Sequence, residues 1–102
     1  MENLLITHSQ ANRGAISQFF IPCNEQSHLD LTEALCRYNG VEIEEVNDKS
    51  ITLSNKDKIE ITKDSWFNMR MIARFFDNRF GKETIINKIE EIKTFTYKGD
   101  TK

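Results

Sequence analysis

The chain begins with two short apolar segments, residues 3–8 and 15–21, which have the composition of β-strands. The Asn-Arg-Gly sequence at 12–14 lies between them and favours a turn. The rival interpretation, a helix over 10–20, places Gly14 in the helix interior at a cost of about 1 kcal/mol relative to alanine. We therefore expect a β-hairpin, closed by Pro22.

Three later segments alternate between apolar and polar residues, with polar turn sequences at 47–49 and 55–57. This period of two predicts an antiparallel meander of three strands, with one buried face and one polar face. The apolar positions of the three strands are Val41 and Ile43, Ile51 and Leu53, and Ile59 and Ile61.

Three segments show the helical period of 3.6 residues. Residues 27–38 place Leu31, Ala34, Leu35 and Tyr38 on one face, with Ser27 or Asp30 as the N-cap and Gly40 as the stop. A second helix spans 65–80, between a capping Asp64 and Gly81. A third is predicted over 83–94, where one stripe contains Ile85, Ile86, Ile89, Ile92 and Phe95.

Together these elements predict an α+β fold in the order β-β-α-β-β-β-α-α. We expect a small antiparallel sheet, made of the N-terminal hairpin plus the three-stranded meander, packed by about three helices. At 102 residues the chain has room for one domain, which we place at residues 1–97. Residues 98–102 are expected to be a polar, disordered tail.

Composition predicts a soluble cytoplasmic protein. No apolar run is long enough to cross a membrane, and residues 1–6 lack the basic and apolar regions of a secretory signal. Cys23 and Cys36 lack CxxC spacing, which favours reduced thiols, with a disulfide between them as the alternative. Ile, Asn and Lys number 30 against 14 for Gly, Ala, Pro and Arg, a skew toward AT-rich codons that points to a low-GC bacterium, its plasmid or its phage.

Charge divides unevenly along the chain, although the net charge is only −2. Residues 1–62 carry five basic and ten acidic side chains, whereas residues 63–102 carry nine basic and six acidic ones. Such asymmetry indicates either a binding face or two halves that neutralise each other within one fold.

The predicted helix over 65–80 has more apolar surface than one sheet can cover. Ile72, Phe76 and Met69 share a side with Ala73 and Phe80, whereas Phe67 and Met71 form a second apolar pair beyond Arg70 and Arg74. Either the helix over 83–94 covers this second pair, or it is exposed for a partner. Because aromatic residues, Met and Arg are enriched at interface cores, the predicted partner-binding residues are Trp66, Phe67, Arg70, Met71 and Arg74.

Two other charged groups are candidate surfaces. Arg70, Arg74, Arg79 and Lys82 are a possible basic strip for nucleic-acid phosphates, although the sequence pI near 5.7 is low for such a protein. The second-choice partner surface is an acidic face on the first meander strand, where Glu42 and Glu44 share one side; it consists of Glu42, Glu44, Glu45 and Asp48.

Signatures of catalysis are missing from the pattern. His8, Cys23, His28 and Cys36 are the only conceivable set of soft metal ligands, and their spacing does not match that of zinc sites. The four glycines stand singly, so there is no phosphate-binding loop. We expect buried thiols, surface histidines, no metal, no cofactor and no enzymatic activity.

These features predict a small non-enzymatic interaction protein, encoded by a phage or mobile element, that inhibits a larger host protein by binding it. We expect a protein partner or a homodimer, and no membrane association. The alternative is a nucleic-acid-binding transcriptional regulator that uses the basic, aromatic helix.

Overall fold

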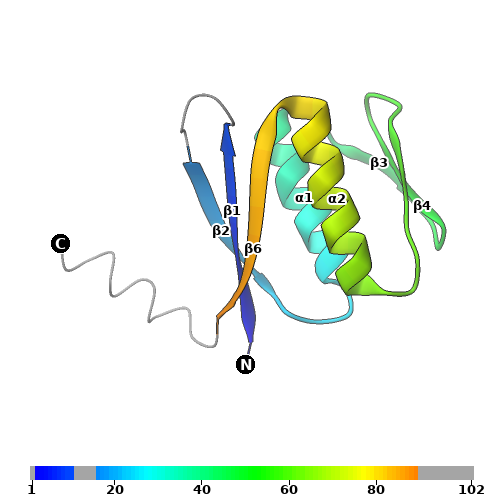
Figure 1. Ribbon diagram of the computed structural model, residues 1–102. Coiled ribbons are helices and arrows are strands. Elements are labelled where there is room, and N and C mark those ends of the chain that lie inside the picture. Colours follow the sequence, from blue (N-terminus) through cyan, green and yellow to red (C-terminus); the bar gives the residue numbers. More distant parts are fainter. Residues whose placement is uncertain (1, 11–15, 90–102) are drawn as a thin grey trace.

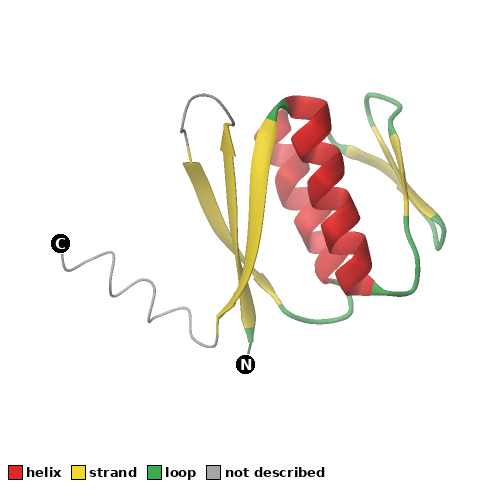
Figure 2. Cartoon of the chain, in the orientation of Figure 1, coloured by secondary structure: helices red, strands yellow, loops and turns green. Residues whose placement is uncertain are grey.

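A computed structural model of the chain, which describes residues 2–10 and 16–89, has two helices between two three-stranded antiparallel sheets (Figures 1 and 2). The α+β class is confirmed. The predicted single sheet with about three helices is wrong, because the hairpin and the meander belong to different sheets and the described residues contain two helices.

The first sheet has the order β2-β1-β6, with β1 (Asn3–Gln10) in the centre. The predicted hairpin is confirmed, because β1 pairs antiparallel with β2 (Ile16–Pro22) from Asn3↔Pro22 to Ser9↔Ile16. The turn predicted at 12–14 lies outside the described residues.

The third strand of this sheet is β6 (Lys82–Ile89), and it corrects the sequence prediction of a helix over 83–94. It pairs antiparallel with the other edge of β1, from Asn3↔Ile89 to Gln10↔Lys82. The segment is rich in β-branched Thr and Ile, which favour strands. Without β6, one side of the central strand would leave its backbone hydrogen-bonding groups open. Residues 90–94 of the predicted helix lie outside the described residues.

The second sheet is the predicted meander, in the order β3-β4-β5. Its strands are β3 (Ile43–Val46), β4 (Ser50–Leu53) and β5 (Lys58–Glu60). The predicted turns are present: Asn47 Oδ1 accepts hydrogen bonds from the backbone N–H groups of Lys49 and Ser50, and Lys56 has a left-handed φ of 77°. The register of β3 shifts between Ile43 and Glu45.

The two helices are α1 (Ser27–Asn39) and α2 (Ser65–Phe80), which lie side by side and run in the same direction in Figure 1. The predicted cap of α2 is confirmed, because Asp64 Oδ1 accepts from the Phe67 N–H at 3.1 Å. The predicted cap of α1 is wrong. Gln26 occupies the N-cap position without a side-chain bond, and the Ser27 hydroxyl donates to the Pro22 carbonyl instead.

The core fills the space between the two sheets and the helices. β1 contributes Leu4 and Ile6, and the meander contributes Ile51, Leu53 and Ile59. The helices contribute fully or almost fully buried side chains at Leu31, Leu35, Cys36, Met69, Ile72 and Phe76. Tyr38, predicted on the buried face of α1, is 44% exposed and stacks on Phe19 of β2 with ring centroids 5.3 Å apart.

The predicted domain boundary and the tail at 98–102 fall outside the described residues. Within residues 2–10 and 16–89, no helix combines the length and apolar composition needed to cross a bilayer.

Candidate interaction face on α2

The start of α2 is held by hydrogen bonds between the Asn68 side chain, in the first turn of the helix, and the Thr62 backbone, which we call the amide clamp. Asn68 is buried, and its Oδ1 accepts from the Thr62 N–H at 2.8 Å while its Nδ2 donates to the Thr62 carbonyl at 2.8 Å. Together with the Asp64 cap, this clamp fixes the first turn of the helix. The clamp therefore determines which side of α2 faces the core and which faces outward.

The outward side carries all five residues that the sequence predicts for partner binding. Trp66 is 39% exposed, Phe67 46% and Met71 38%, and the guanidinium-bearing Arg70 and Arg74 are also exposed. We call these five residues the α2 face. The core side of the same helix contains Met69, Ile72, Ala73 and Phe76.

The α2 face is bordered by β6 rather than covered by a third helix. Lys88 of β6 places its ammonium 4.7 Å from the centroid of the Trp66 ring, a cation–π contact. Phe67 and Met71 lie further around the helix from Trp66, and both side chains remain exposed to solvent. Of the two outcomes weighed from the sequence, covered or exposed, the described part of the structure has the exposed one.

A hollow of about 400 Å³ lies between α2 and β6, next to the α2 face. In the part of the chain that the structure describes, neither Arg70 nor Arg74 has an ion-pair partner within 4.0 Å. The lining residues are Arg70, Ala73, Arg74, Asp77 and Asn78 from α2, and Thr84 and Ile86 from β6.

Behind the hollow lies a polar relay that sequence reasoning missed. The Thr84 hydroxyl donates to Asp77 Oδ1 at 2.7 Å, and the Thr84 N–H donates to Asp77 Oδ2 at 3.2 Å. Since the Thr84 proton is used, His8 Nδ1, at 2.8 Å from Thr84 Oγ1, is the donor of that contact. His8 Nε2 then accepts from Asn39 Nδ2 at 3.1 Å.

His8 is 3% exposed, so the prediction of a surface histidine is wrong. Burial lowers the pKa of His8 below its usual 6.5; Asp77 opposes this effect and Lys82 adds to it. The hydrogen bonds of the relay therefore favour a neutral imidazole. They connect residues of β1, α1, α2 and β6. The sequence does contain a signal for the burial of His8, because alternation places it with Leu4 and Ile6 on the inward side of β1.

Two of the four residues of the predicted basic strip are engaged by other side chains of the chain and are not free to bind phosphates. Arg79 Nε lies 2.8 Å from Asp57 Oδ2, and Lys82 Nζ donates to Gln10 Oε1 at 2.5 Å. Of the four residues, Arg70 and Arg74 are the two without such a partner among the described residues.

The acidic face lies on and beside β3, an edge strand of the second sheet: Glu44 and Glu45 belong to the strand, whereas Glu42 precedes it and Asp48 follows it. Glu42, Glu44, Glu45 and Asp48 are all exposed. Glu44 pairs with Lys56 at 3.5 Å, in an exposed geometry that contributes little energy. The register shift after Ile43 interrupts the regular alternation on which the predicted common side of Glu42 and Glu44 depends.

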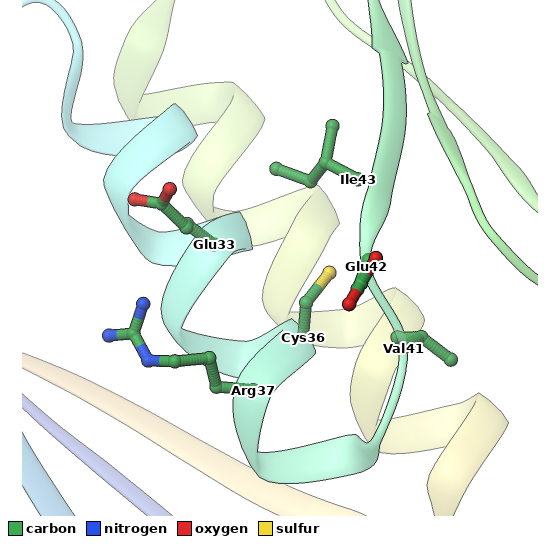
Figure 3. Close-up of a pocket in the computed structure, with 6 residues that line it drawn as sticks. All are labelled: Glu33, Cys36, Arg37, Val41, Glu42 and Ile43. Atoms are coloured by element: carbon green, nitrogen blue, oxygen red, sulfur yellow. The ribbon is translucent and has the colours of Figure 1, made fainter.

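The cysteine and histidine set is dispersed. Cys23 and Cys36 are free thiols, so the disulfide alternative is wrong. Burial raises the pKa of the Cys36 thiol to about 11, with Glu33 as a smaller cause. Its sulfur points toward the segment with Val41, Glu42 and Ile43, across a hollow of about 350 Å³ (Figure 3).

His28 Nδ1 lies 3.0 Å from Ser65 Oγ, which is the geometry of a base next to a hydroxyl. No described residue hydrogen-bonds the other nitrogen of His28, so the orienting third group of a nucleophilic site is missing there. Among the described residues there is also no cluster of three or more His, Cys, Asp or Glu side chains that could hold a metal ion.

Comparison of the chain with protein-family models, with curated proteins and with solved structures gave no match.

Proposed function

We propose that this protein is a non-enzymatic interaction protein that binds a larger protein through the α2 face. In this proposal it acts as an inhibitor that blocks its partner, and a phage or mobile element encodes it, in keeping with the skew toward AT-rich codons. The observation that carries the proposal is the exposure of Phe67 and Met71, 46% and 38%, on adjacent turns of α2 beside Arg70 and Arg74.

Several features of the α2 face support a protein partner. An aromatic ring and a flexible thioether supply apolar contact area, and arginine supplies directed hydrogen bonds at the rim. The face is presented on a helix whose first turn is clamped by Asn68 and Asp64, so little backbone order is lost on binding. A rigid amphipathic helix face is a recurring element in protein recognition.

A twofold dimer through the same face is disfavoured by charge. In an isologous contact the patch meets its own copy, which would bring the Arg70 and Arg74 pairs of two chains together. Like charges at close range oppose association. A partner with a complementary, acidic rim around an apolar surface fits the α2 face better.

The test compares variants of the full chain against a purified partner. A tagged wild-type chain first identifies binders in lysate from a low-GC bacterium, and a captured protein is then purified and titrated by calorimetry. We expect Phe67→Ala and Met71→Ala each to weaken this binary complex by about tenfold or more. Ile85→Ala is the matched control, since Ile85 is also exposed, at 55%, but points to the face of β6 opposite to Thr84 and Ile86, which line the hollow beside α2.

Equal affinity for the Phe67→Ala and Ile85→Ala variants would remove the α2 face as the binding site. Loss of binding in a Glu44→Lys, Glu45→Lys double variant, with Phe67→Ala unaffected, would transfer the site to the acidic face of β3.

The second candidate is a nucleic-acid-binding transcriptional regulator, favoured by the two available arginines next to aromatic rings. Its support is narrower, because Arg79 and Lys82 are engaged by Asp57 and Gln10. A gel shift at low salt with duplex and single-stranded DNA tests it. Binding that falls steeply with salt and is lost in Arg70→Ala would favour the regulator.

A further inference from the structure

The hollow between α2 and β6 has two different walls. Arg70 and Arg74 project from successive turns of α2 on one side, and Thr84 and Ile86 of β6 form the other. The apolar groups Ala73 and Ile86 also line it. A volume of about 400 Å³ admits one or two side chains of another protein rather than a large ligand.

The charges around this hollow are unbalanced. Arg70 and Arg74 lack an ion-pair partner among the described residues, and so does Lys88, whose ammonium lies over the Trp66 ring. The lining contains one carboxylate, Asp77. Both Asp77 oxygens accept hydrogen bonds from Thr84, which holds that carboxylate toward β6.

We infer that this hollow receives a carboxylate side chain from the protein partner, so that the partner presents an acidic segment to the α2 face. The inference rests on the proposed function, since it specifies the partner of the same surface. The guanidinium groups of Arg70 and Arg74 donate hydrogen bonds to this carboxylate. Phe67 and Met71 contact apolar residues of the partner next to the acidic side chain.

The physical basis is the geometry of guanidinium. Its planar fork of N–H donors matches the two oxygens of a carboxylate and forms charge-assisted hydrogen bonds. Arginines four residues apart on a helix lie on one side and converge on the same group.

A nucleic acid fits this surface less well than an acidic protein segment. Closely spaced phosphates need a row of basic side chains, whereas Arg79 and Lys82, beyond Arg70 and Arg74, are engaged by Asp57 and Gln10. Phe67 and Met71 form an exposed aromatic and thioether pair on one side of the face, which matches apolar side chains better than a sugar-phosphate backbone.

The experiment is an NMR titration of the full ¹⁵N-labelled chain at low salt with hexaglutamate as the probe. We expect saturable shifts of the Arg70 and Arg74 Nε–H signals and of the Thr84 amide. Arg70→Ala and Arg74→Ala should each weaken binding by about tenfold. Arg37→Ala is the matched control, because Arg37 is an exposed arginine on α1 beside a different hollow.

Three results would overturn the inference. The first is an absence of Arg70 and Arg74 shifts at millimolar probe, or equal affinity in all three arginine variants. The second is tighter binding of a single-stranded oligonucleotide to the same residues. The third is self-association in sedimentation that Arg70→Ala abolishes, which would assign the hollow to a second copy of the chain.

Binding of the same variants to the partner protein distinguishes failure of this inference from failure of the proposed function. If Phe67→Ala weakens the partner complex while Arg70→Ala and Arg74→Ala do not, the α2 face binds but the carboxylate inference fails. If none of the three variants weakens the complex, the proposed function itself fails.

Discussion

His8 and Thr84 are 76 positions apart in the sequence and meet at 2.8 Å between Nδ1 and Oγ1. The contact joins the middle strand of the first sheet to its last strand, and Asp77 Oδ1 of α2 accepts a hydrogen bond from the Thr84 hydroxyl. Since Asn39 donates to the other imidazole nitrogen, every position around the ring suits neutral histidine.

The first prediction concerns pH. Burial lowers the pKa of His8, and it also lowers that of His28, where Asp30 opposes the shift. The unfolded chain therefore binds protons at a higher pH than the folded chain. The free energy of unfolding should fall as pH decreases below about 6.5, until the lowered pKa values are passed.

Urea unfolding at about pH 7.5 and about pH 5 measures this difference. His8→Gln should lower the free energy of unfolding at neutral pH. It should also reduce the dependence of this free energy on pH, because only His28 then remains with a lowered pKa. A stability that is flat or rises on acidification through this range would contradict the assignment of a neutral, buried His8.

The second prediction concerns the Thr84 hydroxyl. Thr84→Val keeps the shape of the side chain and removes the donor to Asp77 and the acceptor for His8. We expect a loss of about 1–3 kcal/mol in the free energy of unfolding, because both partners lose a hydrogen bond in a half-buried site. Thr84→Ser keeps the hydroxyl and should cost less; equal losses would show that the methyl group contributes as much as the hydroxyl and would contradict this account.

The third prediction concerns the amide clamp. Asn68→Ala leaves the Thr62 N–H and carbonyl without the partners that Asn68 supplies and empties a buried site in the first turn of α2. We expect a loss of about 2–3 kcal/mol by urea unfolding. Asn78→Ala, at an exposed position of the same helix, is the control and should change stability by less than about 0.5 kcal/mol.

The fourth prediction concerns the turn before β5. Lys56 has a φ of 77°, which a side chain with a Cβ adopts at a cost and glycine adopts freely. Lys56→Gly should therefore raise the melting temperature, since the exposed ion pair to Glu44 contributes little. Lys58→Gly in β5 should lower it, because glycine weakens a strand. The same sign for both variants would contradict this account.

The fifth prediction concerns thiol reactivity. Cys36 is 2% exposed and burial raises its pKa to about 11, so it has little thiolate at neutral pH. In the native Cys23→Ser variant, alkylation of Cys36 should proceed far more slowly than in urea. A native rate equal to the rate in urea would show that the segment of Val41–Ile43 opens readily.

Much of the local structure was predictable because it depends on neighbours in the sequence. Alternation at Ile51 and Leu53 defined a strand, and Asp64 and Gly81 marked the ends of α2. The exposed pair Phe67 and Met71 also followed from helical spacing alone.

The sequence by itself determined the α+β class, the hairpin, the meander and both faces of α2, since these depend on side-chain periods within single segments. Tertiary structure decided the rest. The isoleucines of 82–89 satisfy a helical stripe, whereas in a strand the adjacent Ile85 and Ile86 point to opposite faces. Pairing with the open edge of β1 selects the strand in spite of this pattern. The same pairing brings Thr84 to His8 and Asp77 and creates the hollow beside Arg70 and Arg74, because contacts between distant segments exist only after the sheet has closed.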